Sequence, residues 1–187
     1  MATIIIYTIT SCNNASSNSA QSKQTSKADS SNNFIARGKY LVTSIGCDDC
    51  HSPKRMSEMG YEVIPELRFS GYPSNRPFNK ISTDAFSKGW MTFNQDLTSA
   101  AGPWGISFAA NITSDSTGIG TWTETQFIKA LREGKSKGLD GNRPILPPMP
   151  WQNFKNLSDD DLKAIFAFLK TTAPVHNIVP QPIPPQQ

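Results

Sequence analysis

The stretch that decides the fold reads Cys47-Asp48-Asp49-Cys50-His51. Two cysteines three positions apart on a helical turn face the same side. Two cysteines at this spacing, with a histidine directly after the second, form the attachment pattern of covalent haem. The two thiols add to the two vinyl groups of one haem, and the adjacent imidazole coordinates the iron. We therefore expect one haem c, attached through Cys47 and Cys50, with His51 as an axial ligand.

Two other chemistries use a Cys-x-x-Cys pair. A zinc site needs three or four protein ligands, and beyond this motif only Cys12 and His176 remain, near opposite ends of the chain. A redox dithiol is expected after a thioredoxin-like βαβ pattern, and no such pattern precedes Cys47. Zinc and dithiol chemistry remain alternatives, but haem explains more of the motif.

The composition indicates a loop-rich domain. Of 187 residues, 37% are hydrophobic, and the chain has 14 prolines and 12 glycines, whereas ordinary globular chains are roughly 45–50% apolar. The net charge of +3 is mild, and no run of Lys or Arg indicates nucleic-acid binding. No stretch reaches the roughly 18 apolar residues that a membrane span needs. Helical bundles, coiled coils, repeats and multipass membrane proteins are therefore not expected.

The N-terminus resembles a bacterial lipoprotein signal. Residues 1–12 are apolar and end in Ile9-Thr10-Ser11-Cys12, and residues 13–33 are almost all polar or small. In that family the cysteine takes the lipid, and a polar tether of this kind is expected to be disordered. The apolar run is short for a secretory signal, and no basic residue precedes it. A signal truncated at its front, with the true start codon upstream, would explain both departures. The resemblance implies lipidation at Cys12 and a place in the periplasm or cell envelope.

Helix signals flank the haem motif. The spacing of apolar residues predicts a helix over 34–42, where Gly38 would allow another helix to approach. Thr123 and Gln126 form the pattern of a capping box, and Gly134 is the expected stop. Ser158 is the expected N-cap of a last helix that ends before Pro174. Its buried stripe is Leu162, Ile165, Phe166 and Leu169.

The remaining segments are expected to lack regular helices. Five prolines between residues 52 and 121 break any long helix. We expect this insertion to consist of loops, with a short hairpin, lying over the haem. The Pro-rich tail, residues 176–187, is expected to be loose or extended.

The sixth iron ligand is expected to be Met149. It lies among Pro147, Pro148 and Pro150, which hold the segment extended at little entropic cost. The other candidates are Met56 and Met59, which follow His51 too closely to reach the opposite haem face, Met91 in the insertion, and His176 after the last helix.

Several segments resemble class I c-type cytochromes, and most of all the haem domains of cytochrome subunits of bacterial membrane-bound alcohol and gluconate dehydrogenases. They are 110–115, 117–122, 127–134, 149–151 and 157–162. The resemblance covers residues 34–175 and implies an all-α cytochrome c fold, with Leu162, Phe166 and Leu169 in its core and helices crossing near Gly38. In the family the methionine of the Met-Pro-aromatic segment is the distal ligand, here Met149.

The implied function is extracytoplasmic electron transfer by one haem with His/Met ligation, without catalysis of its own. The implied partners are a redox donor and acceptor, including a membrane dehydrogenase or terminal oxidase. A basic rim for such a partner could be formed by Lys54, Arg55, Lys135, Lys137 and Arg143, and Arg143 or a tryptophan could bind a haem propionate. The alternatives are a subunit of a dehydrogenase complex, a haem enzyme or sensor with an open sixth position, and a non-haem metal module.

Overall fold

The computed structural model describes residues 18–77, 81–82 and 84–185. Two units are distinguished, residues 1–33 and residues 34–187. Helix α1 (Asn18–Ser44) begins within residues 13–33, the predicted tether. Cys12 and the predicted signal lie outside the described residues. No helix in the described part of the chain is both long and apolar enough to cross a bilayer.

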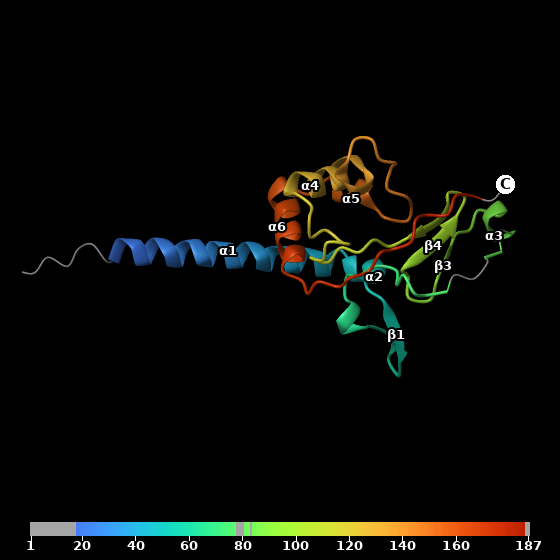
Figure 1. Cartoon of the computed structure of the whole chain (residues 1–187), viewed down its shortest axis with the longest axis horizontal. Helices are drawn as coiled ribbons and strands as arrows, with labels where there is room; N and C mark the ends of the chain where they lie inside the picture. The colour runs from blue at the N-terminus through green and yellow to red at the C-terminus, as the bar shows by residue number, and fades with distance from the viewer. Residues whose placement is uncertain (1–17, 78–80, 83, 186–187) are drawn as a thin grey trace, which may run out of the picture. The chain divides into compact units, whose positions relative to one another are not determined.

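The second unit is built around one apolar cluster. Helices α4 (Glu124–Glu133) and α6 (Asp159–Lys170) lie side by side in it (Figure 1), and the C-terminal part of α1 crosses α6. The cluster comprises Leu41, Val42, Phe69, Ile119, Phe127, Leu131, Leu162, Ile165, Phe166, Phe168 and Leu169. The predicted core stripe of the last helix is confirmed, since all four of its residues are buried here.

The crossing of α1 and α6 takes place at Gly38. A Cβ atom at this position would lie 1.9 Å from the Ala164 carbonyl oxygen and 2.8 Å from the Phe168 Cβ. Glycine is therefore required by the close approach of the two backbones, as the sequence predicts.

Both predicted helix caps form. The Thr123 hydroxyl accepts from the Gln126 amide and the Gln126 side chain accepts from the Thr123 amide, which completes the capping box of α4, and Gly134 ends that helix with φ 64°. The Ser158 hydroxyl accepts from the Asp161 amide at the start of α6. These interactions satisfy backbone groups that a helix end leaves without partners.

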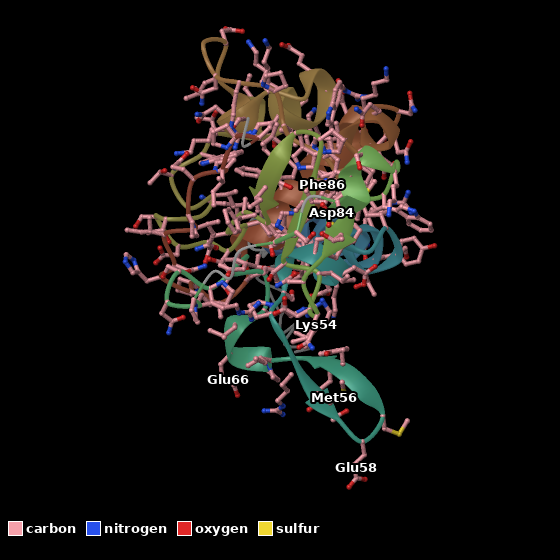
Figure 2. The ribbon with its side chains drawn as sticks, turned by 90° about the vertical axis from the view of Figure 1, so that its right-hand side faces the viewer. Lys54, Met56, Glu58, Glu66, Asp84 and Phe86 are labelled. Carbon is pink, nitrogen blue, oxygen red and sulfur yellow. The ribbon has the colours of Figure 1, made fainter. Side chains whose placement is uncertain are left out.

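The expected all-α fold is wrong, because the insertion between His51 and Asn111 contains two antiparallel sheets. Strands β1 (Lys54–Ser57) and β2 (Gly60–Val63) form a hairpin. It projects from the rest of its unit, with Met56 and Glu58 near its tip (Figure 2). Strands β3 (Thr92–Phe93), β4 (Ser99–Gly102) and β5 (Gly105–Phe108) form the second sheet, in that order.

These strands give a weak signal in the sequence. All residues of β4 are buried, so this strand shows no alternation of polar and apolar residues. Strand β3 has only two residues, too few for a periodic pattern. Short helical elements complete the fold: α2 (Cys47–His51), η1 (Pro65–Leu67), α3 (Asp84–Ser87), η2 (Ser136–Gly138) and α5 (Trp151–Phe154).

The C-terminal tail is extended and anchored. Ile183 forms an antiparallel bridge with Ile106 of β5, with N–O distances of 2.7 and 3.0 Å. The buried side chain of Asn177 donates to the carbonyls of Ser70 (2.7 Å) and Tyr72 (2.9 Å). The extended half of the prediction is confirmed, but the described part of the tail is held against the insertion rather than loose.

Candidate haem-attachment site

The two motif cysteines lie on a single helical turn. Helix α2 contains both of them together with His51, and Gly46, with φ 75°, turns the chain from α1 into it. Both thiols are free and half-buried, and Cys47 packs against the apolar cluster. One turn thus presents two thiols and an imidazole at the edge of the core.

The thiols are held in their protonated form. Burial, followed by the charges of Asp48 and Asp49, raises the pKa of Cys47 to about 12. Burial and Asp49 also raise the pKa of Cys50. An S–H group adds across a vinyl double bond without loss of atoms, so protonated thiols suit haem attachment. The described residues contain no group of three or more His, Cys, Asp or Glu placed to hold a metal ion.

The His51 imidazole is oriented by the insertion. Its Nδ1 lies 2.7 Å from the carbonyl oxygen of Ala110. A carbonyl only accepts, so Nδ1 carries the hydrogen and Nε2 keeps a lone pair available to a metal. Burial lowers the pKa of His51, although the Ala110 bond opposes this, so the environment favours the neutral ring. A neutral imidazole with one oriented nitrogen is the form that binds haem iron.

The backbone around His51 is closely fitted. The His51 carbonyl accepts from the Gly71 amide at 2.8 Å. Gly71 has φ 76°, and a Cβ there would lie 2.4 Å from the Ala109 carbonyl oxygen. Only glycine fits this position, which brings the segment with Ala110 against the histidine.

An ion pair fixes the side of the turn. Arg68 donates through Nε and a terminal nitrogen to the two oxygens of Asp48, at 2.9 and 2.6 Å. The Ser52 hydroxyl donates to Asp48 at 2.7 Å and accepts from the Phe69 amide at 2.9 Å. Although burial works to raise the pKa of Asp48, the hydrogen bonds from Arg68 and Ser52 outweigh it and lower that pKa. The two-point fork makes the turn rigid.

Met149 lies beside the same apolar cluster as Cys47, and its side chain is half-buried. Its carbonyl accepts from the Trp151 amide at 2.9 Å, and the preceding Pro147 carbonyl accepts from the Ser107 hydroxyl of β5 at 2.6 Å. A small cavity of about 280 Å³ runs along this segment. The Met149 segment is thus held from both ends at the edge of the core.

Comparison with known proteins gives relatives that are subunits of bacterial dehydrogenases, several of them cytochrome subunits. No family model matches the chain. It is 31% identical over 144 residues to the gluconate 2-dehydrogenase cytochrome c subunit of Pantoea cypripedii, covering 76% of this chain and 24% of that protein. It is 28% identical over 153 residues to the fructose dehydrogenase cytochrome subunit of Gluconobacter japonicus, covering 81% and 24%. The chain is a homologue of bacterial cytochrome c subunits.

A shorter stretch of this cytochrome homologue matches a further protein. It is 46% identical over 67 residues to the cytochrome c subunit of the quinone-dependent alcohol dehydrogenase of Gluconobacter oxydans, covering 35% of this chain and 13% of that protein. The chain therefore spans a quarter or less of the length of these relatives. The residues of the haem motif fit the cofactor that the relatives' names imply, since two free thiols and an oriented imidazole share one turn.

The other candidate ligands of the cytochrome homologue point to solvent. Met59, at the tip of the β1–β2 hairpin, is 98% exposed, and Met56 and Met91 are also exposed. His176 is exposed, with its Nδ1 3.6 Å from an Asp115 oxygen. Among the candidates, only Met149 packs against the core.

The expected basic rim is partly engaged in other contacts. Arg55 pairs with Glu62 across the hairpin at 2.8 Å. Arg143 donates to the Pro144 carbonyl at 2.9 Å, and Lys54 donates to backbone carbonyls around α2. The assignment of Arg143 or a tryptophan to a propionate stays a prediction.

Sequence reasoning missed the residues that hold the turn. The Ala110 carbonyl, and the Asp96 carbonyl that accepts from the Lys54 ammonium, lie far along the chain from the turn, and no local pattern marks either. Arg68 could have been suspected as a cation for Asp48, because a carboxylate that becomes half-buried on folding needs a partner. A glycine at position 71 is typical of a turn, but the sequence does not show that the backbone of Ala109 lies against it.

Proposed function

We propose that the chain carries one covalently bound haem c and transfers single electrons. The observation that carries this proposal is the α2 turn, with two free thiols and an imidazole whose Nε2 is left available, in a homologue of cytochrome c subunits. In this proposal the Cys47 and Cys50 thiols would each hold the haem by adding across one vinyl group, and His51 Nε2 would bind the iron. When bound, the haem supplies a one-electron couple between ferric and ferrous iron.

Met149 completes the ligand set in this proposal. A thioether favours ferrous iron and raises the reduction potential relative to a second histidine. The packing of Met149 and Cys47 against one cluster supports the assignment, as does the solvent exposure of the competing methionines. With His51 and Met149 as its ligands, the iron would have no position for substrate or oxygen, so the chain would act as a carrier and not as an enzyme.

The protein's own groups keep this ligand set in place. The Ala110 carbonyl holds the imidazole in one tautomer and increases its basicity. The Asp48–Arg68 fork holds the turn that carries the thiols. Rigid ligands change little between oxidation states, which is what fast electron exchange requires.

We place this activity outside the cytoplasm, in the periplasm or cell envelope, with a lipid anchor on Cys12. The proposed partners are a redox donor and acceptor, one of them a membrane dehydrogenase. Support comes from the lipoprotein-like N-terminal pattern and from the names of the relatives, which are cytochrome subunits of gluconate and fructose dehydrogenases.

Haem staining after a denaturing gel tests the proposal. The wild-type band should stain, and the Cys47→Ser/Cys50→Ser double variant should not. Cys12→Ser is the matched control, because it removes a cysteine outside the motif and should leave the stain unchanged. A stained double variant, or an unstained wild-type protein from a host with a c-type haem attachment system, would refute covalent haem.

A further inference from the structure

Lys54 is the one lysine whose described contacts converge on the α2 turn. It follows the turn directly and begins strand β1. Its ammonium donates to the carbonyls of Asp49 (2.6 Å), Ser52 (3.2 Å) and Asp48 (3.3 Å). These carbonyls lie at the C-terminal end of the turn, where backbone dipoles favour a positive charge.

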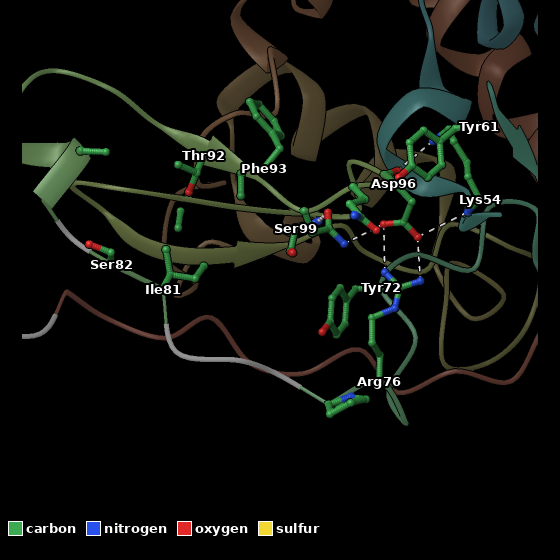
Figure 3. Close-up of a pocket in the computed structure, with 16 residues that line it drawn as sticks. Lys54, Tyr61, Tyr72, Arg76, Ile81, Ser82, Thr92, Phe93, Asp96 and Ser99 are labelled. Carbon is green, nitrogen blue, oxygen red and sulfur yellow. Dashed lines mark hydrogen bonds and ion pairs between the residues drawn. The ribbon is translucent and has the colours of Figure 1, made fainter. Parts of the chain in front are cut away.

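The same ammonium reaches across to the insertion. It donates to the Asp96 carbonyl at 3.0 Å, and the Lys54 backbone amide lies 3.4 Å from an Asp96 carboxylate oxygen. Figure 3 shows Lys54 beside Asp96, on the wall of a cavity of about 790 Å³ in the insertion. Lys54 therefore joins the haem-attachment turn to a segment more than forty residues away in the chain.

The far end of this connection is rigid. Asp96 is 3% exposed, and Arg76 donates to both of its carboxylate oxygens, at 2.9 and 2.7 Å. The Thr98 hydroxyl and the Asn94 amide donate to it as well, both at 2.7 Å. The Asp96 carboxylate is thus paired with Arg76, and the Asp48 carboxylate, whose charge Lys54 also stabilises, is paired with Arg68, while the Lys54 ammonium itself donates to carbonyl oxygens.

A cation held in this way acts on a nearby redox centre. Oxidation of a haem adds a positive charge, which a fixed cation disfavours. A cation enclosed by backbone carbonyls is screened by salt less than one on an open surface. The effect of Lys54 on a haem bound to α2 should therefore persist at high ionic strength.

We propose that Lys54 is a positioning residue that clamps the haem-attachment turn to the Asp96 segment and raises the reduction potential of the bound haem. This inference rests on the proposed function. It also assigns a role to the insertion, which supplies both the Ala110 carbonyl that orients His51 and the Asp96 carbonyl that holds Lys54.

The test compares Lys54→Met with Arg55→Met in the full-length haem protein. Lys54→Met keeps a long apolar stem but removes the charge. Arg55→Met removes a neighbouring charge that is exposed and paired with Glu62. Lys54→Met should lower the reduction potential at both low and high salt, while Arg55→Met should lower it only slightly and only at low salt.

Hydrogen exchange separates the clamp from the charge. The amides of Ser52 and Thr98 should exchange about tenfold faster in Lys54→Met, as expected for the loss of charge-assisted hydrogen bonds. The Phe127 amide in α4 should not change. Lys54→Arg provides the second comparison, because it keeps the charge but its planar fork cannot direct three hydrogens to these carbonyls. It should keep most of the potential and lose part of the protection.

The outcomes are distinguishable from those of the proposed function. A wild-type protein without covalent haem refutes the proposed function. A haem-loaded Lys54→Met protein whose potential and Ser52 and Thr98 exchange match those of Arg55→Met refutes the clamp. If Lys54→Met does not fold, a Lys54→Arg protein identical to wild type in both measurements also refutes it.

Discussion

At the scale of single residues, the direction of the nitrogen and sulfur lone pairs decides which side chains can bind iron. His51 Nδ1 is occupied by the Ala110 carbonyl at 2.7 Å, so the other ring nitrogen is the one that can bind iron. Met149 is the candidate for the opposite side because it alone among the candidate ligands packs against the core cluster. The two assignments are independent, since they rest on different segments.

Replacing Met149 with Ala should open the iron to external ligands. Without the thioether the reduction potential should fall, since sulfur favours ferrous iron. Ferrous protein should then bind carbon monoxide, and the weak long-wavelength band of ferric methionine-ligated haem should disappear. Absorption spectra with and without carbon monoxide measure both changes.

Met91→Ala is the matched control, because Met91 is an exposed methionine of the insertion. It should keep the band and exclude carbon monoxide. The reverse pattern would place the ligand in the insertion. Carbon monoxide binding by the wild-type protein would instead indicate an open sixth position, as in a haem enzyme or sensor.

At the scale of helices and strands, α1 and α6 cross at Gly38, and both contribute residues to the core cluster. Gly38→Ala should destabilise the protein by about 1–3 kcal/mol through overpacking. Alanine would otherwise favour the helix by roughly 1 kcal/mol, but its Cβ would lie 1.9 Å from the Ala164 carbonyl oxygen. Thermal unfolding measures the difference. Lys39→Ala, at an exposed position of the same helix, should have almost no effect, and an equally small effect of Gly38→Ala would disprove the close crossing.

The insertion should show a characteristic pH dependence through Asp96. Burial works to raise its pKa, but hydrogen bonds from Arg76 and Thr98 lower it from 3.8 to about 2. The folded pKa lies below the unfolded one, so the stabilisation is present above pH 4 or so and is lost as pH falls towards 2. At neutral pH it amounts to roughly 2 kcal/mol.

Asp96→Asn should therefore be less stable than wild type at pH 7 by roughly this amount or more. The difference in free energy of unfolding between wild type and Asp96→Asn should narrow as pH falls from about 4, because the wild-type carboxylate then takes up a proton and loses its charge. Denaturant unfolding at several pH values measures it. Glu62→Gln removes an exposed partner and should cost less than about 1 kcal/mol. A difference in free energy of unfolding that stays constant as pH falls towards 2 would contradict the assigned role of Asp96.

The helix ends of this protein could be predicted from local sequence patterns, whereas the positions of its strands could not. The caps at Thr123 and Ser158 were predictable because a cap joins residues three positions apart. The strand Ser99–Gly102 was not, because it is short, small and wholly buried, and its pairing with β5 decides its conformation. The haem turn was readable from its spacing, whereas its supports at Ala110 and Lys54 depend on segments that only tertiary structure brings together.

At the scale of the whole molecule, the N-terminal pattern predicts a membrane anchor. In its native host the protein should incorporate labelled palmitate and sediment with membranes, and Cys12→Ala should release it into the soluble fraction. Cys50→Ser is the control for a cysteine change without loss of the anchor. Equal membrane association of wild type and Cys12→Ala would argue against lipidation.

Covalent attachment of haem at the α2 turn is the property on which the proposed electron transfer depends, and mass spectrometry of the denatured wild-type protein tests it most directly. The peptide that contains residues 47–51 should carry the added mass of one haem. Cys47 and Cys50 should then resist alkylation, since each sulfur is already bonded to the haem. A 47–51 peptide without haem, with both cysteines freely alkylated, would contradict the account.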